Sequence, residues 1–400
     1  MDRGAPDASP PLPVIACMGV GQIVAWGSSF YLLAVLAGPI ARATGWSNGW
    51  IVGALSLGLL IAGIGSPRVG HLIERFGGRP VLATSAALLA AGLLMQAVAP
   101  SLPVFILAWC VIGLGMSAGL YDPAFATLGR LYGEHARGAI TRLTLFGGFA
   151  STVCWPLSAL FVAHLGWRGA CLAFAAINLV VVLPLYWFGV PREAHRPPPP
   201  RHAAHAAGRR LSAEDRYALA LIAVNFTLAA VIMTVVAVHV LTLMQARGLT
   251  LDAAVGLGAL IGPAQVGARV LEAVFGRRFH PVWSFLISGL LVTGGLCMLL
   301  GPAGVIGAGL VLYGSGSGIR SIVRGTLPLA LFGREGYAVL IGWLAMPSLV
   351  AQAASPSVGS LLIAHLGSQG TIAVLIAAAV VNALLVLPLL PLVRRRPAHA

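Results

Sequence analysis

The sequence predicts an all-α membrane protein with twelve transmembrane helices in two six-helix bundles. Of its 400 residues, 58% are hydrophobic and only 9% are charged, and the mean hydropathy is +0.92. Soluble domains carry about a quarter charged residues, so this chain has too little polar surface to cover globular domains in water. The length suits roughly twelve spans of ~20 residues with short connections. Disorder, a coiled coil and a disulfide scaffold are excluded by the same composition.

Apolar stretches bounded by Gly, Pro or Arg follow one another along the chain in two sets of six. The first set covers 14–37, 49–70, 81–99, 103–128, 138–164 and 169–189. The second set covers 217–245, 253–275, 282–300, 303–323, 337–364 and 370–392. We therefore expect a tail over 1–13, bundles over 14–189 and 217–393, a solvated linker over 190–216, and a tail over 394–400. A lipid-binding basic patch is the alternative interpretation of the linker.

The two sets repeat each other at an offset of about half the chain. The segment 76–79 (Phe-Gly-Gly-Arg) has a counterpart at 275–278 (Phe-Gly-Arg-Arg). The segment Ala-His-Leu-Gly occurs at both 163–166 and 364–367. Two halves related by a parallel repeat are the architecture expected of an alternating-access transporter.

The arginines predict the orientation of the chain in the membrane. All basic residues other than histidine are arginine, and no lysine is present. They gather in the connections after the second, fourth, sixth, eighth and tenth spans and in the C-terminal tail, leaving Arg42, Arg168 and Arg247 for the other side. The positive-inside rule places both termini in the cytoplasm, and we expect a bacterial inner membrane. This bias explains the net charge of +14 without a nucleic-acid partner.

The connection after the second span, residues 70–81, reads Gly-His-Leu-Ile-Glu-Arg-Phe-Gly-Gly-Arg-Pro-Val. It resembles the loop signature of the major facilitator superfamily, glycine–x–leucine–x–acid–arginine–x–glycine–x–arginine, with Glu74 in place of the usual aspartate. The resemblance covers the whole chain and implies secondary transport. It also implies a conformational-switch loop, formed by Gly70, Glu74, Arg75, Gly77 and Arg79.

Each residue type in this loop has a physical use. Gly70 and Gly77 allow close helix approach and a tight turn. Glu74 can hold either a helix N-terminus or an arginine of the same bundle. Arg75 and Arg79 can anchor the loop at the anionic inner leaflet. A topology anchor without a gating role is the alternative.

Three features resemble the monocarboxylate-porter and oxalate:formate branch of that superfamily. They are the Arg-Phe-Gly-x-Arg-Pro-Val form of residues 75–81, the Gly-Trp-Arg-Gly of residues 166–169, and Arg269. That branch carries an arginine implicated in carboxylate binding at the place of Arg269. Gln265 lies one turn before it, where monocarboxylate porters often have an acid. The resemblance implies a small organic anion as substrate.

Ionisable groups inside the spans are candidate sites, because each costs several kcal/mol in a bilayer without a partner or a cavity. The repeat places Asp122 opposite Arg320, with Arg324 one turn further along the same face. Asp122 and Arg320 form a gating ion pair, or Arg320 binds an anionic substrate while Asp122 takes a coupling proton. Snorkelling to the interface is the alternative. Arg269 suits a carboxylate ligand, although Glu272, three residues on, could equally neutralise it.

Two pairs of polar residues share helix faces near the expected cavity. Gln22 and Trp26 lie one turn apart, and Asn225 and His239 lie on one face of the seventh span. We expect Gln22, Trp26 and Asn225 to contact substrate and His239 to be a candidate proton carrier. Bonding to a neighbouring helix, or for His239 a wet interface, is the alternative in each case.

No catalytic, metal-binding or nucleotide-binding motif is present, so neither enzyme activity nor a cofactor is expected. The leading prediction is a monomeric secondary transporter of a small organic anion, working by proton coupling or exchange. Drug efflux is the alternative within the same class. A non-transporting membrane sensor or accessory protein is the alternative from another class.

Overall fold

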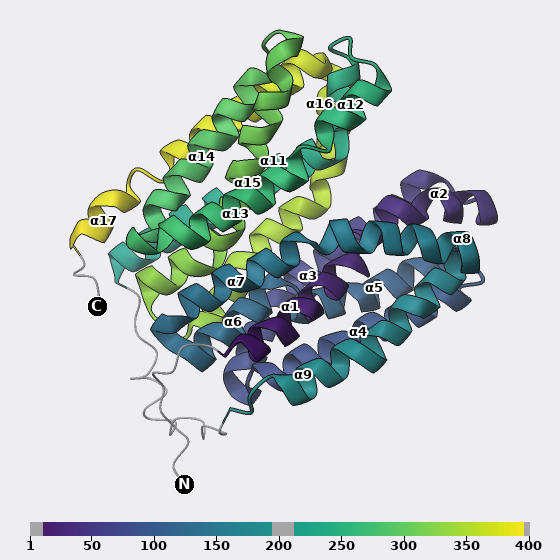
Figure 1. Ribbon diagram of the computed structural model, residues 1–400, viewed down its shortest axis with the longest axis horizontal. Coiled ribbons are helices and arrows are strands. Elements are labelled where there is room, and N and C mark those ends of the chain that lie inside the picture. The colour runs from purple at the N-terminus through teal and green to yellow at the C-terminus, as the bar shows by residue number, and fades with distance from the viewer. Residues whose placement is uncertain (1–10, 194–211, 396–400) are drawn as a thin grey trace. The chain divides into compact units, whose positions relative to one another are not determined.

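The computed structural model describes residues 11–193 and 212–395, and every regular element in them is helical (Figure 1). Residues 1–10, 194–211 and 396–400, which hold most of the predicted tails and linker, lie outside the described residues. In the first half the helices are α1 Leu12–Gly27, α2 Leu32–Thr44, α3 Asn48–Phe76, α4 Gly78–Val98, α5 Leu102–Gly119, α6 Tyr121–Tyr132, η1 Gly133–His135, α7 Ala136–Gly148, α8 Ala150–Ile177, η2 Asn178–Val182 and α9 Leu183–Gly189. In the second half they are α11 Ala213–Gln245, α12 Leu251–Gly258, α13 Ile261–Phe275, η3 Gly276–Arg278, α14 Pro281–Met298, α15 Ala303–Phe332, α16 Tyr337–Leu384 and α17 Leu389–Arg395.

Nine helical stretches in the described part of the chain are long and apolar enough to cross a membrane. Two of them, Ala136–Gly189 and Tyr337–Val393, each contain two of the predicted spans. Both are interrupted by a glycine with positive φ, Gly166 at 69° and Gly367 at 65°. Such a backbone favours glycine, which explains why the repeat keeps one at both places. The all-helical membrane fold is confirmed, and the count of twelve spans stays a prediction.

The chain forms two compact units. The first contains residues 1–193 and 334–353, and the second contains 194–333 and 354–400. The division falls inside α16, so the first turns of this helix pack within the first unit. There Gly70 of α3 lies against Ala338, and Gly342 lies against Ser66; a Cβ on either glycine would come within 2.5 Å of the facing carbonyl oxygen. Glycine therefore permits the close approach expected at Gly70.

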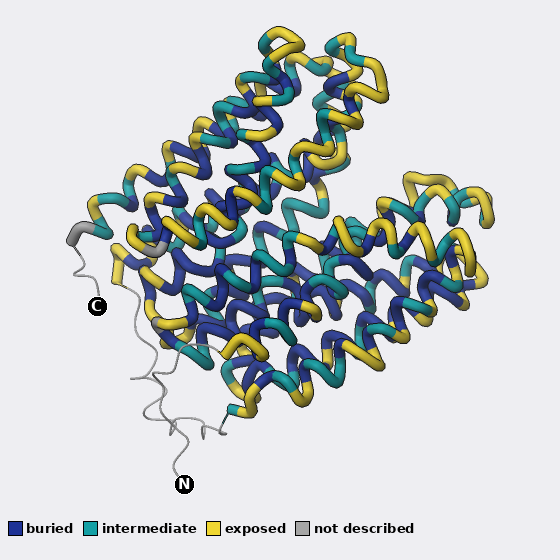
Figure 2. Tube along the Cα trace, viewed as in Figure 1, coloured by how far each residue is buried: buried dark blue, intermediate teal, exposed yellow. Residues whose placement is uncertain are grey.

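The core of the first unit lies where α3, α4, α5 and α8 meet. Phe105, Trp109 and Phe174 are among its fully buried side chains. Small residues let the helices approach: a Cβ on Gly113 would lie 3.0 Å from the Cα atom of Gly58. Close packing through small residues is the usual basis of helix association in membranes. Figure 2 shows the buried residues along the inner sides of these helices.

The core of the second unit follows the same rule. Leu296 of α14, Leu310 of α15 and Val235 of α11 are buried together. A Cβ on Gly295 would come within 2.5 Å of the Gly309 carbonyl oxygen, so α14 and α15 touch through their backbones. Large apolar side chains on outward faces are exposed instead, as at Phe188 (81%) and Val180 (73%) of the first unit. Apolar surface on this scale suits a lipid environment.

Candidate functional site

The helix formed by α5 and α6 is broken at Leu120. Its backbone angles there are φ −79° and ψ −164°, and α6 begins at the next residue. Pro123 has no N–H to offer to the carbonyl of Gly119, four residues earlier. The side chain of Gln22 replaces that donor: its Nε2 donates to Gly119 O at 2.7 Å and to Leu120 O at 3.4 Å. Gln22, predicted to contact substrate, thus holds the helix break.

Asp122 lies in the first turn of α6, directly after the break. A carboxylate at a helix N-terminus is favoured by the helix dipole. Asp122 also lines a small hollow of about 10 Å³ with the hydroxyl-bearing residues Ser66 and Ser117. A space of this size is at the lower limit for one water molecule. The predicted pair with Arg320, a residue of the second unit, stays a prediction.

Trp26 belongs to an aromatic cluster formed by Trp26, Phe30, Tyr31, Tyr121 and Trp155. The ring of Trp26 lies 5.2 Å from that of Tyr121 and 5.5 Å from that of Phe30. Tyr31 lies edge-on to Trp155 at 6.0 Å, and Trp155 lines an open, largely apolar hollow of about 490 Å³ between α2 and α8. The cluster therefore connects the predicted substrate contact to a concave surface of the first unit.

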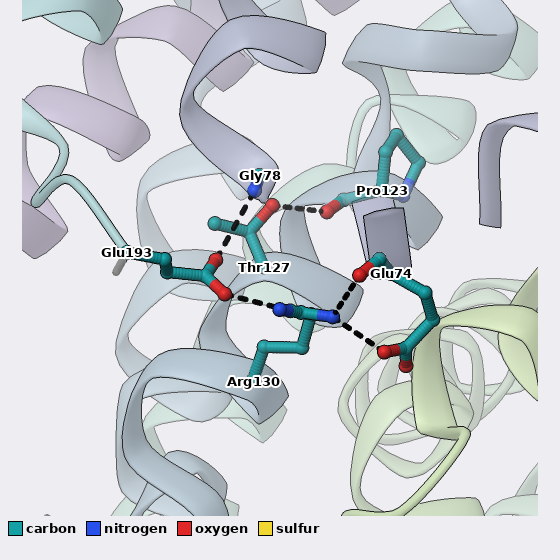
Figure 3. Close-up of polar contacts among 6 residues, drawn as sticks. All are labelled: Glu74, Gly78, Pro123, Thr127, Arg130 and Glu193. Carbon is teal, nitrogen blue, oxygen red and sulfur yellow. Dashed lines mark hydrogen bonds and ion pairs between the residues drawn. The ribbon is translucent and has the colours of Figure 1, made fainter. Parts of the chain in front are cut away.

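A charge cluster of Glu74, Arg130 and Glu193 joins three segments of the first unit (Figure 3). Arg130 Nε donates to Glu193 Oε2 at 2.7 Å. Its Nη1 donates to the carboxylate of Glu74 and, at 2.7 Å, to the backbone oxygen of the same residue. The other oxygen of Glu193 accepts from the amide of Gly78 at 3.1 Å, at the first residue of α4.

This arrangement explains several residues of the switch loop. Glu74 is expected to bind either a helix N-terminus or an arginine of the same bundle, and in the structure it binds such an arginine, Arg130. Gly77 turns the chain with φ 84°, which brings the start of α4 to Glu193, where the helix dipole favours a carboxylate. The guanidinium of Arg75 lies 5.0 Å from the ring of Phe76, and that of Arg79 lies 4.9 Å from the ring of Trp187.

Sequence reasoning missed two members of the charge cluster. From the sequence, Arg130 contributes only to the predicted orientation of the chain, and Glu193 falls at the start of the predicted linker. One signal was available, since Glu193 is the only carboxylate between Glu134 and Glu214. A lone acid directly after a membrane span, in a bundle whose connections are rich in arginine, suggests a partner among those arginines.

Arg269 lies in α13 and is 7% exposed. Its Nε donates to the carbonyl of Gly318 in α15 at 3.4 Å. A Cβ on Gly318 would lie 2.9 Å from the Cα atom of Gln265, so α13 and α15 are in backbone contact at this level. Glu272 accepts from the hydroxyl of Ser284 at 2.7 Å. Gln265 and Arg269 thus follow one side of α13 against α15.

Arg320 lies on another side of α15 and is 6% exposed. Its Nη1 donates to Asn225 Oδ1 at 2.7 Å, and its guanidinium lies 5.3 Å from the ring of Phe285. Asn225 also exchanges bonds with Asn382: each side-chain amide donates to the other's backbone oxygen, at 2.5 Å and 2.7 Å. Arg324, one turn on, lies 5.9 Å from the ring of Phe226. These contacts join α11, α14, α15 and α16.

His239 has a partner separate from that of Asn225, although the two share a helix face. Its Nε2 lies 3.0 Å from the carbonyl oxygen of Pro356. A Cβ on Gly359 would lie only 2.6 Å from Nε2 of His239, so the imidazole fits here because this residue has no side chain. The structure therefore brings Asn225 to Arg320 and places His239 against α16.

The model of the Major Facilitator Superfamily matches residues 18–323. The chain belongs to this superfamily. It is 28% identical to human (Homo sapiens) monocarboxylate transporter 11 over 355 residues, covering 82% of this chain and 70% of that one. It is 34% identical to monocarboxylate transporter 13 of Bos taurus over 148 residues, covering 36% of this chain and 32% of that one.

Solved structures agree on the fold. The proton:xylose symporter XylE bound to a bromodeoxyglucose matches with a TM-score of 0.74 at 14% identity, over 93% of this chain and 94% of that one. The human organic anion transporter MFSD10 matches with a TM-score of 0.73 at 18% identity, over 94% and 100%. The predicted superfamily is confirmed, and the monocarboxylate transporter relatives agree with the predicted branch.

Proposed function

We propose that this superfamily member is a secondary active transporter of a small organic anion, a carboxylate, working by alternating access with proton coupling or exchange. The observation that carries the proposal is Arg269, a guanidinium buried inside a membrane span of a chain related to monocarboxylate transporters. A permanent charge in a bilayer is strongly unfavourable without an anionic or polar partner, so its presence favours a functional use.

The surroundings of Arg269 suit this role. The bond from its Nε to Gly318 O fixes the side chain against α15 and limits the orientations of the guanidinium. A guanidinium held in one plane can recognise two carboxylate oxygens side by side. We assign Gln265, one turn earlier, as a neutral hydrogen-bonding neighbour of the same ligand.

The coupling proton is proposed to use Asp122. Asp122 lines a water-sized hollow together with two hydroxyl-bearing residues, in a helix that is interrupted directly before it. His239 and Glu272, which belong to the second unit, are the other residues that we propose as candidate proton carriers. The bacterial inner membrane, the monomeric state and the cytoplasmic position of both termini are part of the same proposal. The position of the termini rests on the arginine distribution.

The charge cluster is proposed to stabilise one state of the switch loop. Arg130 bonds the end of α3 through Glu74 and the segment after α9 through Glu193. A charged pair shielded from water in one state and broken in another contributes to the energy difference between the states. The loop that contains Glu74 and Gly77 would then respond to movement of α6.

Counterflow into proteoliposomes tests the proposed function. Proteoliposomes that contain the purified protein are preloaded with one unlabelled compound from a panel of mono- and dicarboxylates, and uptake of the labelled compound is measured. The same measurement is made with neutral sugars and with cationic drugs. We expect saturable exchange for one or more carboxylates and none for the other classes. Exchange of cationic drugs alone would replace the proposal with the efflux alternative. Absence of exchange across all three classes would favour a sensor or accessory protein.

A further inference from the structure

One nitrogen of the Arg320 guanidinium donates a hydrogen bond, and the other two do not. Nη1 donates to Asn225 Oδ1 at 2.7 Å, whereas Nε and Nη2 are buried and have no hydrogen-bond partner. These two nitrogens are neighbours on the guanidinium, and their N–H bonds run parallel along one edge. This unpaired edge can therefore donate two parallel hydrogen bonds to one ligand.

The neighbours of this edge are neutral. Phe285 covers one face of the group at 5.3 Å, and a Cβ on Gly289 would lie 3.6 Å from Nη2. Within the described residues no carboxylate forms an ion pair with Arg320. Arg324 adds a second positive charge one turn away. Two small residues, Gly289 and Ala383 of α16, lie beside Nη2 and close to each other, since a Cβ on Gly289 would lie 3.2 Å from Ala383.

A buried guanidinium with unused donors and no counter-charge is strongly unfavourable. A planar anion with two coplanar oxygens would satisfy both N–H bonds and the charge together. A halide is a single sphere and cannot accept both bonds in their preferred directions. The geometry thus favours an oxyanion over chloride.

We propose that Arg320 and Asn225 form a second anion site, inside the second unit, which binds a planar monovalent oxyanion such as a carboxylate or bicarbonate. The site differs from that of Arg269 in its residues and its helices: Arg269 faces α15 from α13, whereas Arg320 faces α11 and α14. Its occupant connects these helices by neutralising the charge between them. The inference does not depend on transport, because binding alone reports it.

Thermal unfolding of the purified full-length protein in detergent is the primary measurement. Formate, acetate and bicarbonate are titrated at constant ionic strength, with chloride and neutral acetamide as comparisons. We expect a saturable rise in Tm with the oxyanions, a smaller one with chloride, and none with acetamide. Equal effects of chloride and formate, or no saturable rise with any oxyanion, would overturn the proposal.

Asn225→Asp is the decisive variant because it places a carboxylate where Asn225 Oδ1 already contacts Arg320. The new carboxylate should neutralise Arg320 in place of an external anion, so formate should bind at least about tenfold more weakly. Asn225→Ala removes the amide without adding charge, so it should weaken formate binding less than Asn225→Asp does. Arg320→Lys keeps the charge without the two-pronged edge and should lose the preference for formate over chloride. Wild-type responses in both Asn225→Asp and Arg320→Lys would contradict the site.

Counterflow with the same variants distinguishes the source of the anion. If Asn225→Asp weakens the transported carboxylate and formate together, the occupant is the substrate. If transport affinity is unchanged while the response to formate is lost, the occupant is a small oxyanion from solution. A wild-type protein that binds formate through Arg320 but exchanges no carboxylate would refute the proposed function and leave this site standing.

Discussion

Gln22 donates its side-chain amide to the carbonyl of Gly119, 97 residues away, at a distance of 2.7 Å. It does so where Pro123 withholds the backbone donor that a continuous helix would supply. The offset of 199 residues between segments 76–79 and 275–278 also relates Gly119 to Gly318, and the carbonyl of Gly318 accepts from the side chain of Arg269. The same carbonyl position is thus bonded from another helix in both units, by a neutral donor in one and a charged donor in the other.

Gln22→Leu should destabilise the first unit by about 1–3 kcal/mol, the usual cost of leaving a buried carbonyl unsatisfied. Thermal or denaturant unfolding in detergent measures it. Pro123→Ala restores an N–H that can serve Gly119, so the cost of Gln22→Leu should shrink in the Pro123→Ala background. Equal costs in both backgrounds would show that the amide does not substitute for the missing donor.

Glu193→Gln should weaken the charge cluster because Arg130 then loses a charged acceptor and the start of α4 loses a negative charge. Removing one partner of a partly buried pair costs about 1–3 kcal/mol, and we expect transport to fall several-fold. Counterflow at matched protein levels is the measurement. Glu335→Gln, a change at an exposed carboxylate, is the control. Normal transport in Glu193→Gln would leave the cluster a static feature of the fold.

Gly77→Val should reduce transport far more than membrane insertion. Gly77 has φ 84°, where a β-branched residue is strained by roughly 1–3 kcal/mol, while the apolar spans remain intact. Gly49→Val is the matched control, since Gly49 has ordinary φ and open space around it. Uptake per inserted molecule is compared between the two, together with Glu74→Lys. Near-normal uptake in both loop variants would make the loop a topology anchor only.

The sequence predicted most of the fold because span length, apolar content and the glycine repeat are local properties. Gly166 and Gly367 were matched by the repeat, and the structure gives both the positive φ that requires glycine. The candidate site was less accessible. The bond from Gln22 to Gly119 and the ion pair from Arg130 to Glu193 connect residues 97 and 63 positions apart, and no local pattern pairs them. Polar residues could be found as candidates, but their partners depend on helix packing.

Introduced cysteines in the 190–216 linker and at the C-terminus should both be labelled from the cytoplasmic side. The distribution of arginines between alternate connections motivates this topology. The measurement uses a membrane-impermeant thiol reagent on intact cells and on inverted vesicles. A background lacking the five native cysteines is needed, because Cys297 is exposed. Labelling of either introduced cysteine in intact cells would reverse the orientation.

Arg269 should discriminate best between substrate classes. Arg269→Lys keeps the charge but loses the two-pronged donor, so it should weaken carboxylate binding, and Arg269→Ala should abolish it. Losing a charge-assisted bond to a buried anion costs on the order of 2–5 kcal/mol, roughly thirty- to several-thousand-fold in affinity. Counterflow with mono- and dicarboxylates compares both variants with wild type, and Arg42→Ala, at an exposed arginine, is the control. If Arg269→Ala transports its best substrate with unchanged affinity, the bond from Arg269 to Gly318 is structural. The organic-anion proposal would then lose the residue that carries it, and efflux of other solutes would be favoured.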